Sequence, residues 1–495
     1  MEIFNSGFAI GFGINRKIWG IFIRPPLARS RPLIRARRTY NFANGITILC
    51  KFCIKNASVS FASVLPLRGP TPYKSIAKLG LNRFFVFYFL ICSLLFSFPI
   101  QSYSAKLKSE DEKFLDMVSQ DSFQFFLDKY HQGTGLINDN STTYSPCSVA
   151  SVGFGLTAYC IGAQRHWVDK NDAYDRVLKT LKFFQSNVAQ KNGFYYHFVN
   201  IRTGAPVWNS EVSSIDTAIF LAGALSAGEY FKGTEVESLA NELYERVDWP
   251  WMLNGKTVLC MGWKPDIKEN NGFLPYYWDS YSELMIIYAL AIGSPTKPIS
   301  PKYWDAWKRP AEKLGSNAFI YCPTGSLFVY QYSQAFIDFR NIRDKYANYW
   351  TNSVKATIAD REWCIENRKI YKGYWGISAC LGPDGYAGYG SVPEQKSLHD
   401  GTIAPSALAG SIPFCPDECI STMRSLYKNY GADVYGQYGF VNGVNLNANW
   451  FSRDFIGIDQ GITVLMIENY RSEFVWKYFM QHPAIKKWLE LCMQS

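Results

Sequence analysis

Histidine is scarce in this chain, with only five among 495 residues. None of the five stands in a recognisable catalytic triad, and none has metal-ligand spacing with Cys415 and Cys419. The loop at 385–390 contains glycines but lacks the strand and helix that a phosphate-binding loop requires. We therefore expect no metal and no cofactor, although His197 and His399, which sit in aromatic or polar loops, could touch a substrate.

Acidic residues are almost absent from the first part of the chain. Residues 1–105 contain 14 Lys and Arg against a single acid, Glu2, which gives a net charge of +13. The remaining residues contain 37 basic and 40 acidic side chains, a net charge of −3, so the leader accounts for the +10 of the whole chain. Because this leaves the folded part without a basic face for phosphates, we do not expect nucleic acid as a partner.

The apolar run at 84–98 is 15 residues long, which is short for a membrane span. It follows a basic residue and precedes a proline and a stretch of small residues, the order of a secretory signal. We expect export to the periplasm or cell surface, with 82–105 as a signal peptide or an anchor. Residues 1–81 are then a basic leader, either disordered or untranslated, and a transit peptide is the alternative. Membrane contact is expected only through 84–98, if this run is uncleaved.

Apolar residues at helical spacing recur in one segment after another from residue 106 onward, separated by Gly-, Pro- and Asn-rich loops. This pattern predicts an all-α domain over 106–495, with few strands. The predicted helices cover residues 109–130, 147–165, 172–188, 213–231, 235–246, 280–292, 301–314, 329–344, 346–365, 416–430, 460–471 and 473–493.

Twelve helices in one domain have one especially economical arrangement, the (α/α)6 double-helical barrel, or toroid, in which six outer helices surround six inner ones. The inner helices run parallel to one another, so acids placed at several of their N-termini would converge at one mouth. A solenoid of helix pairs also satisfies the helix number. Three loops, at 193–198, 373–376 and 385–390, are aromatic where ordinary loops are polar, and we expect them to line that mouth.

Carboxylates and aromatic rings occur together just before one predicted helix. Trp208, Glu211 and Asp216 precede or begin the apolar segment 217–226. Acids supply protons and activate water, while flat rings stack on sugars, so the combination favours cleavage of glycosidic bonds. Asp216 also fits a capping pattern that begins at Ser213, and it is by itself more typical of a structural residue. Glu211 lies ahead of the helix and has no capping role, which makes it the better functional candidate.

A second stretch repeats the combination at 276–283. Asp279 and Glu283 are four residues apart and would share one face of a helical turn, among four aromatic residues that include Trp278 and Tyr281. A capping box from Ser280 to Glu283 explains the same spacing. Both interpretations stay open, and the aromatic neighbours favour the functional one. A helix N-terminus should lower the pKa of Glu283, whereas burial beside Asp279 and the rings should raise it.

A third acid, Asp459, directly precedes the predicted helix 460–471. Helix N-capping is the alternative interpretation, and spacing alone favours it. The same segment contains Arg453 six residues earlier.

The chain resembles the bacterial glucoamylase-like glycoside hydrolases that include the endo-β-1,2-glucanases (glycoside hydrolase family 144). The resemblance rests on residues 208–216, 278–283 continuing to 293–296, 400–405, and 457–461 continuing to 466–470. These ordered motifs span nearly all of residues 110–485. The resemblance implies the helical barrel, no metal, and hydrolysis of a β-linked glucan, foremost β-1,2-glucan, with inversion at the anomeric carbon.

Carried over to this sequence, the family pattern implies that Glu283 is the general acid. Glu211 and Asp459 would position substrate or activate water, and which of them is the base stays open. Ser280 stands where we expect an acid in many relatives, which would remove one charge from the pocket. The candidate substrate-binding residues are Asp279, Trp278, Tyr281, Trp208, Asp216, Trp375, His399, Asp400 and Arg453.

Two other functions compete with hydrolysis. A polysaccharide lyase on a similar toroid would need basic groups opposite uronate carboxylates, whereas the folded part is slightly acidic. A non-catalytic glycan-binding protein of the cell surface could use the same aromatic cleft. In each case we expect an oligosaccharide or polysaccharide partner and a monomeric protein.

Overall fold

The computed structural model describes residues 109–494, except for 315–316 and 392–397. The predicted leader at 1–81 and the predicted signal or anchor at 82–105 lie outside the described residues. Within the described residues, no helix combines the length and the apolar character needed to cross a membrane.

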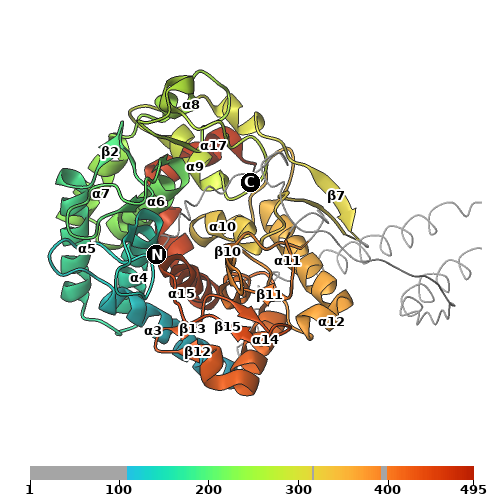
Figure 1. Cartoon of the computed structure of the whole chain (residues 1–495). Coiled ribbons are helices and arrows are strands. Elements are labelled where there is room, and N and C mark those ends of the chain that lie inside the picture. Colours follow the sequence, from blue (N-terminus) through green and yellow to red (C-terminus); the bar gives the residue numbers. More distant parts are fainter. Residues whose placement is uncertain (1–108, 315–316, 392–397, 495) are drawn as a thin grey trace, which may run out of the picture. The chain divides into compact units, whose positions relative to one another are not determined.

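Helices of two kinds alternate along the chain, and one kind forms an inner ring (Figure 1). Each member of this ring packs on the next, and the last packs on the first. The members are α4 (Val149–Gln164), α6 (Ser214–Tyr230), α9 (Met285–Gly293), the short pair η3 (Leu327–Tyr330) and α10 (Tyr332–Phe336), α13 (Pro405–Gly410), and α15 (Gly457–Ser472).

An outer set of helices covers the inner ring, and its members face solvent on one side. They are α3 (Ser109–Asp128), α5 (Lys170–Ser186), α7 (Glu235–Glu245), α11 (Tyr349–Glu366), α14 (Pro416–Tyr430) and α17 (Pro483–Cys492). The all-α prediction and the (α/α)6 toroid are confirmed.

Composition explains which helices are inner. Every residue of α4 from Val149 to Ala163 is buried, and α9 is buried throughout. In contrast, α5 and α7 bury only one stripe and expose charged side chains on the other face. A helix that is apolar all round must be covered on every side, whereas an amphipathic helix can cover it.

The remaining elements are short. The helical turns are α8 (Trp249–Leu253), η1 (Glu269–Gly272), η2 (Pro301–Asp305), α12 (Arg368–Tyr371), η4 (Gly431–Asp433) and α16 (Phe474–Phe479). The strands are β1 (Cys147–Ser148), β2 (Gln190–Lys191), β3 (Phe194–Tyr195), β4 (Phe198–Val199), β5 (Val212–Ser213), β6 (Gly262–Trp263), β7 (Ala311–Leu314), β8 (Asn317–Ile320), β9 (Cys380–Gly382), β10 (Gly385–Ala387), β11 (Thr402–Ile403), β12 (Tyr435–Gly436), β13 (Gly439–Phe440), β14 (Val444–Asn445) and β15 (Trp450–Phe451).

Three of these strands lead directly into inner helices. Strand β1 precedes α4, β5 precedes α6, and β11 closely precedes α13. Each pairs antiparallel with a strand from a neighbouring loop, in the registers Ser148↔Phe198, Ser213↔Gly262 and Ile403↔Val444. The pairing fixes where each inner helix begins, and therefore which residues its first turn presents.

Two predicted helices are wrong. Residues 301–314 form only the 3₁₀ turn η2 and then strand β7, because Pro310 interrupts the helical pattern and Arg309 turns back to bond the carbonyls of Trp304 and Trp307. The outer helix that packs against α9 is α17, near the C-terminus, and not a helix at 301–314. Residues 329–344 contain only the end of η3 and the five-residue helix α10.

The predicted helix 473–493 is two helices, α16 and α17, separated at Pro483. Conversely, α13 was not predicted, because six residues are too few to show a helical period.

The contact between α4 and α6 depends on glycine. A Cβ added to Gly223 would lie 1.9 Å from the carbonyl oxygen of Gly153 on the facing helix, and neither helix can move without disturbing the core. We expect Gly223→Ala to lower the free energy of unfolding by about 1–3 kcal/mol, the cost of overpacking. Gly228→Ala, on the same helix but 3.3 Å from the Ala240 methyl, is the matched control and should be nearly neutral. Urea unfolding measures both, and equal midpoints would contradict the prediction.

Candidate active site

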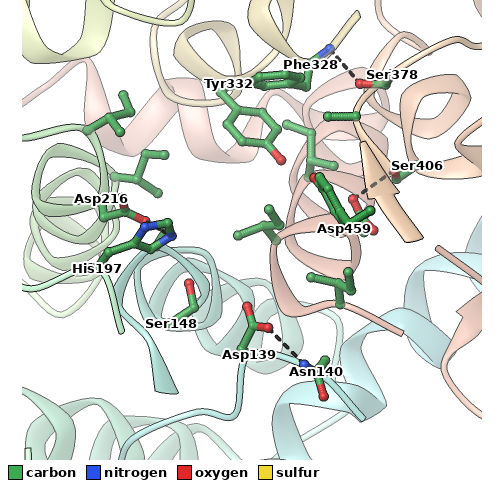
Figure 2. Close-up of a pocket in the computed structure, with 18 of the residues that line it drawn as sticks. Asp139, Asn140, Ser148, His197, Asp216, Phe328, Tyr332, Ser378, Ser406 and Asp459 are labelled. Atoms are coloured by element: carbon green, nitrogen blue, oxygen red, sulfur yellow. Dashed lines mark hydrogen bonds and ion pairs between the residues drawn. The ribbon is translucent and has the colours of Figure 1, made fainter. Parts of the chain in front are cut away.

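A cavity of about 240 Å³ lies where the inner helices begin (Figure 2). Each of the six inner elements contributes a residue at or beside its start, namely Ser148, Asp216, Glu283, Tyr332, Ser406 and Asp459. Acids far apart in the sequence therefore meet in one space, as the barrel geometry requires.

Glu283 lies in the turn just before α9 and is 1% exposed. The Ser333 hydroxyl donates a 2.6 Å hydrogen bond to the backbone carbonyl of Glu283 and fixes the turn. The Oε2 atom of Glu283 has no hydrogen-bond partner within the described structure. Burial, reinforced by the negative charge of Asp216, raises the pKa of Glu283 to about 7. A carboxyl group in this state can hold a proton at neutral pH.

His197 joins two of the acids. Its Nδ1 atom lies 3.1 Å from Oε1 of Glu211, and its Nε2 atom lies 3.5 Å from Oδ1 of Asp216. Burial alone would lower the pKa of His197, but Asp216, Glu211 and Asp139 together raise it to about 9. The pKa of Glu211 is lowered. Burial alone would raise it, but the hydrogen bond and the charge of His197 bring it below its usual value. Glu211 is therefore ionised.

Asp459 is held through both carboxylate oxygens. The Ser406 hydroxyl donates to Oδ1 at 3.0 Å, and the side-chain amide of Asn442 donates to Oδ2. Burial outweighs these two hydrogen bonds and, with a smaller contribution from the charge of Asp139, raises the pKa of Asp459 to about 7. The side chain is therefore fixed in place and titrates near neutral pH.

Asp139 comes from the loop between α3 and α4 rather than from a helix start. Its carbonyl accepts a 2.7 Å hydrogen bond from the amide of Gly457, which ties the loop to the first turn of α15. Asn140 donates a 3.0 Å hydrogen bond to its carboxylate. Burial raises the pKa of Asp139 to about 6, against the lowering effects of Asn140 and His197.

Tyr332 lines the same cavity as the acids. Burial, reinforced by the negative charges of Asp459, Glu283 and Asp216, raises the pKa of its hydroxyl well above the usual value. Its ring packs edge-on against Phe154, and Figure 2 shows the hydroxyl directed into the cavity. Tyr332 therefore adds a polar group to the cavity that the three acids line.

Comparisons with known proteins show what the chain is similar to. The model of the Glycoamylase family matches residues 275–483. A curated exo-β-1,2-glucooligosaccharide sophorohydrolase (non-reducing end) of Parabacteroides distasonis is 29% identical over 423 residues, which are 77% of this chain and 58% of the relative. The resemblance to the glucoamylase-like hydrolases is confirmed. The chain spans less than two thirds of that curated relative.

Solved structures of β-1,2-glucanases share the glucoamylase-like fold. The endo-β-1,2-glucanase of Chitinophaga pinensis, in complex with sophorotriose and glucose, is 28% identical at a TM-score of 0.72, over 78% of this chain and 99% of that one. The β-1,2-glucanase of Parabacteroides distasonis is 26% identical at a TM-score of 0.72, over 77% of this chain and 60% of that one.

The structure brings five of the predicted site residues together. Glu283, Asp459, Asp216 and Trp208 line the cavity directly, and Glu211 reaches it through His197. Trp208 is 54% exposed at the rim, above Phe198, and both Trp208 and Asn209 have left-handed backbone angles. Two consecutive residues in this conformation are held in place against strain, as is common at binding sites.

The other predicted site residues lie away from the cavity, and their surroundings are structural. Trp278 donates a 2.8 Å hydrogen bond from Nε1 to the Ser214 hydroxyl inside the core. Tyr281 is buried and stacks parallel to Tyr349. The carboxylate of Asp279 is half exposed and pairs with Lys308. The repulsive neighbour of Glu283 is therefore Asp216 and not Asp279.

Four more predicted residues lie outside the cavity lining. Trp375 donates a 2.8 Å hydrogen bond from Nε1 to Thr422. His399 packs against the edge of Trp363, and Asp400 caps its own turn by accepting from the amide of Thr402. Arg453 is exposed and lies next to Asp454, which does line the cavity.

Ser280 does not line the cavity either. It forms a backbone bridge with Lys308, on the outside of the turn that ends at Glu283. The serine therefore leaves the charges of the cavity unchanged.

The capping alternatives have different outcomes. The capping box from Ser280 to Glu283 does not form, since α9 begins at Met285 with Leu284 as its N-cap. Asp459 is not an N-cap, because α15 begins two residues before it. Ser213 does cap α6 through the amide of Asp216, yet Asp216 also faces His197 and lines the cavity. A capping residue can thus serve the site as well.

Of the aromatic loops, two reach the cavity. Phe198, at the end of loop 193–198, and Tyr386, in loop 385–390, belong to its lining, while loop 373–376 does not. The expectation that all three line the mouth is thus met in two cases. Among the described residues, no cluster of three or more His, Cys, Asp or Glu side chains is arranged to hold a metal ion.

Proposed function

We propose that the chain is an inverting glycoside hydrolase that cleaves β-1,2-linked glucan. The observation that carries the proposal is Glu283, a fully buried carboxyl whose pKa of about 7 and unpartnered Oε2 suit a general acid. The acid-rich cavity and the similarity to a sophorohydrolase and two β-1,2-glucanases support the substrate class.

In the proposed reaction, Glu283 donates its proton to the glycosidic oxygen while the bond from that oxygen to the anomeric carbon breaks. Asp459, as carboxylate, accepts a proton from a water molecule whose oxygen attacks the same carbon from the opposite face. One proton leaves Glu283 and one arrives at Asp459, so the charge of the site is conserved. Attack from the opposite face inverts the anomeric configuration.

The test incubates the purified protein with linear β-1,2-glucan and follows the first product by proton NMR. The expected product is the α-anomer, which then mutarotates. Release of the β-anomer would indicate a retaining mechanism and contradict inversion. Binding of the glucan without turnover would favour the glycan-binding alternative, and an unsaturated product that absorbs ultraviolet light from a uronate polymer would favour a lyase.

We further propose that the protein is exported. The proposal rests on the sequence order at 82–105, a basic residue, an apolar run and small residues. N-terminal sequencing of the protein from a fractionated native host tests it. A start near residue 106 in the exported fraction supports cleavage, and a cytoplasmic protein with an uncleaved N-terminus contradicts export.

The exposed Trp208 at the cavity rim predicts a sugar-stacking site. We expect Trp208→Asn to raise KM about tenfold with little change in kcat, since covering an aromatic face contributes roughly 1.5–3 kcal/mol to binding. Asparagine tolerates the left-handed backbone at this position, so the loop should keep its shape. Tyr427→Ala, at an exposed ring on α14 outside the cavity, is the control and should leave KM unchanged. An unchanged KM in Trp208→Asn would remove the stacking role.

A further inference from the structure

Among the described residues that line the cavity, His197 is the one basic side chain among the acids. The titratable groups facing His197 are Glu211, Asp216 and Asp139, all of them carboxyls. Both imidazole nitrogens point at carboxylate oxygens, at 3.1 Å for Glu211 and 3.5 Å for Asp216. The contact with Glu211 is a hydrogen bond, and Asp216 lies within ion-pair distance. A neutral imidazole carries only one N–H group and could present it to only one of the two carboxylates, whereas the imidazolium presents an N–H group to each.

The backbone of His197 is as firmly held as its ring. Its amide donates to the carbonyl of Glu211 at 2.9 Å, and its carbonyl accepts from the amide of Val149 at the start of α4 at 3.1 Å. The ring stacks on Phe198 with centroids 3.9 Å apart. His197 therefore connects the starts of two inner helices and cannot turn away from the two acids.

We propose that His197 is a positioning residue, a charged imidazolium that favours the anionic forms of Glu211 and Asp216 and through Asp216 adds to the hold of Glu283 on its proton. This inference rests on the proposed function and assigns the cavity a charge arrangement. Burial raises the pKa of Asp216, and the charge of His197 and the hydrogen bond from Ser213 oppose that rise, so loss of His197 would raise the pKa of Asp216 further and favour its neutral form. Since the charge of Asp216 helps to raise the proton affinity of Glu283, loss of His197 would release the proton from Glu283 at lower pH.

The first experiment measures the charge of His197 directly and needs no activity. Proton and nitrogen NMR of the histidine side chains is recorded on the full chain at neutral pH, and His197→Gln identifies the resonance of His197 by its loss. We expect both ring nitrogens of His197 to be protonated at pH 7.5. His482, whose pKa burial lowers to about 4, and His131, whose pKa burial lowers as well, provide neutral references in the same spectrum. A neutral His197 ring at pH 7.5 would overturn the proposal.

The second experiment compares pH profiles of kcat/KM for the wild type and His197→Gln. We expect the basic limb of the variant, which reports the general acid, to move about one pH unit lower, so that the loss of activity grows about fivefold between pH 6 and pH 8. A residue with only a structural role would lower the profile equally at all pH values, and that outcome contradicts the proposal. His166→Asn, at an exposed histidine far from the cavity with a left-handed backbone, is the control.

The two experiments separate failure of this inference from failure of the proposed function. A charged His197 in a protein that hydrolyses no β-1,2-glucan would leave the charge arrangement in place and reject the hydrolase. An active hydrolase with a neutral His197, or with an unshifted basic limb in His197→Gln, would reject the positioning role alone. If His197→Gln fails to fold, the histidine spectrum of the wild type still decides.

Discussion

Glu283→Gln is expected to abolish hydrolysis of β-1,2-glucan while the domain stays folded. A general acid contributes roughly 10²- to 10⁴-fold to the rate, so kcat should fall by about that factor. The amide keeps the size of the carboxyl, and Oε2 has no hydrogen-bond partner to lose within the described structure. Glu229→Gln, at a buried glutamate of α6 outside the cavity lining, is the matched control and should retain activity.

A substrate with a good leaving group makes this prediction specific to acid catalysis. An aryl β-sophoroside with an acidic phenol needs no protonation when its bond breaks. Glu283→Gln should therefore lose far less activity on this substrate than on the glucan. An equal loss on both substrates would show that Glu283 acts otherwise, and full turnover of the glucan would exclude Glu283 as the acid.

The same variant has a pH-dependent effect on stability. In the folded state the pKa of Glu283 is about 7, above its ordinary value of 4.5, so folding favours the protonated form. The contribution of Glu283 to stability is thus fully present below about pH 4.5 and is lost as the pH rises through 7. Glutamine stays neutral at every pH, so the Tm of Glu283→Gln should match that of the wild type near pH 4.5 and exceed it at pH 8. A Tm difference independent of pH would contradict the raised pKa.

The inner helices could be predicted from sequence because their apolar character is strong. Helices such as α4 and α6 are apolar all round and long enough to show their period. The inner elements at 327–336 and 405–410 are too short for that signal, and only the closure of the ring identifies them as inner. Likewise, α17 occupies an outer place far from its sequence neighbours, which a pattern along the chain cannot indicate.

The acids were predictable only where they flank a helix. Glu283 and Asp459 stand next to strongly apolar segments, so their position at the mouth follows from the barrel. Asp139 lies in a loop that is held at the site by a backbone bridge between Asn140 and Ile456. Pairing between segments so far apart in the chain leaves no local pattern in the sequence. His197 was named only as a residue that could touch a substrate; its pairing with Glu211 and Asp216 was not predicted, because these acids lie 14 and 19 residues further along the chain.

The aromatic residues show the opposite error. Trp278 and Tyr281 were predicted to bind sugar because they flank Glu283, yet both rings are buried in the core. Large rings contribute most to stability when fully covered, so an aromatic residue beside an acid is as typical of core packing as of stacking on a sugar. Trp208 differs in being more than half exposed, and exposure cannot be read from sequence.

Asp459→Asn is expected to reduce hydrolysis as severely as Glu283→Gln, by about 10²- to 10⁴-fold in kcat, because it removes the proposed base. The side chain should keep its place: asparagine can still accept from Asn442 through its oxygen, and its amide can donate to the Ser406 hydroxyl, which is free to rotate. The fold is therefore not expected to change, and circular dichroism checks this.

The substrate with a good leaving group separates the base from the acid. In a single displacement the water must lose its proton whatever group departs, so Asp459→Asn should be equally impaired on the glucan and on the aryl sophoroside. Azide needs no deprotonation, and its addition should restore turnover of the aryl substrate and yield an α-glycosyl azide.

Asp139 is the competing base, since it lines the same cavity and its pKa is about 6. If azide restores Asp139→Asn and not Asp459→Asn, the base is Asp139, and Asp459 serves to bind the substrate. Because the charge of Asp139 helps to raise the pKa of Asp459, Asp139→Asn should also move the acidic limb of the kcat/KM profile to lower pH when Asp459 is the base. The direction of that limb and the azide product thus identify the base by two independent measurements.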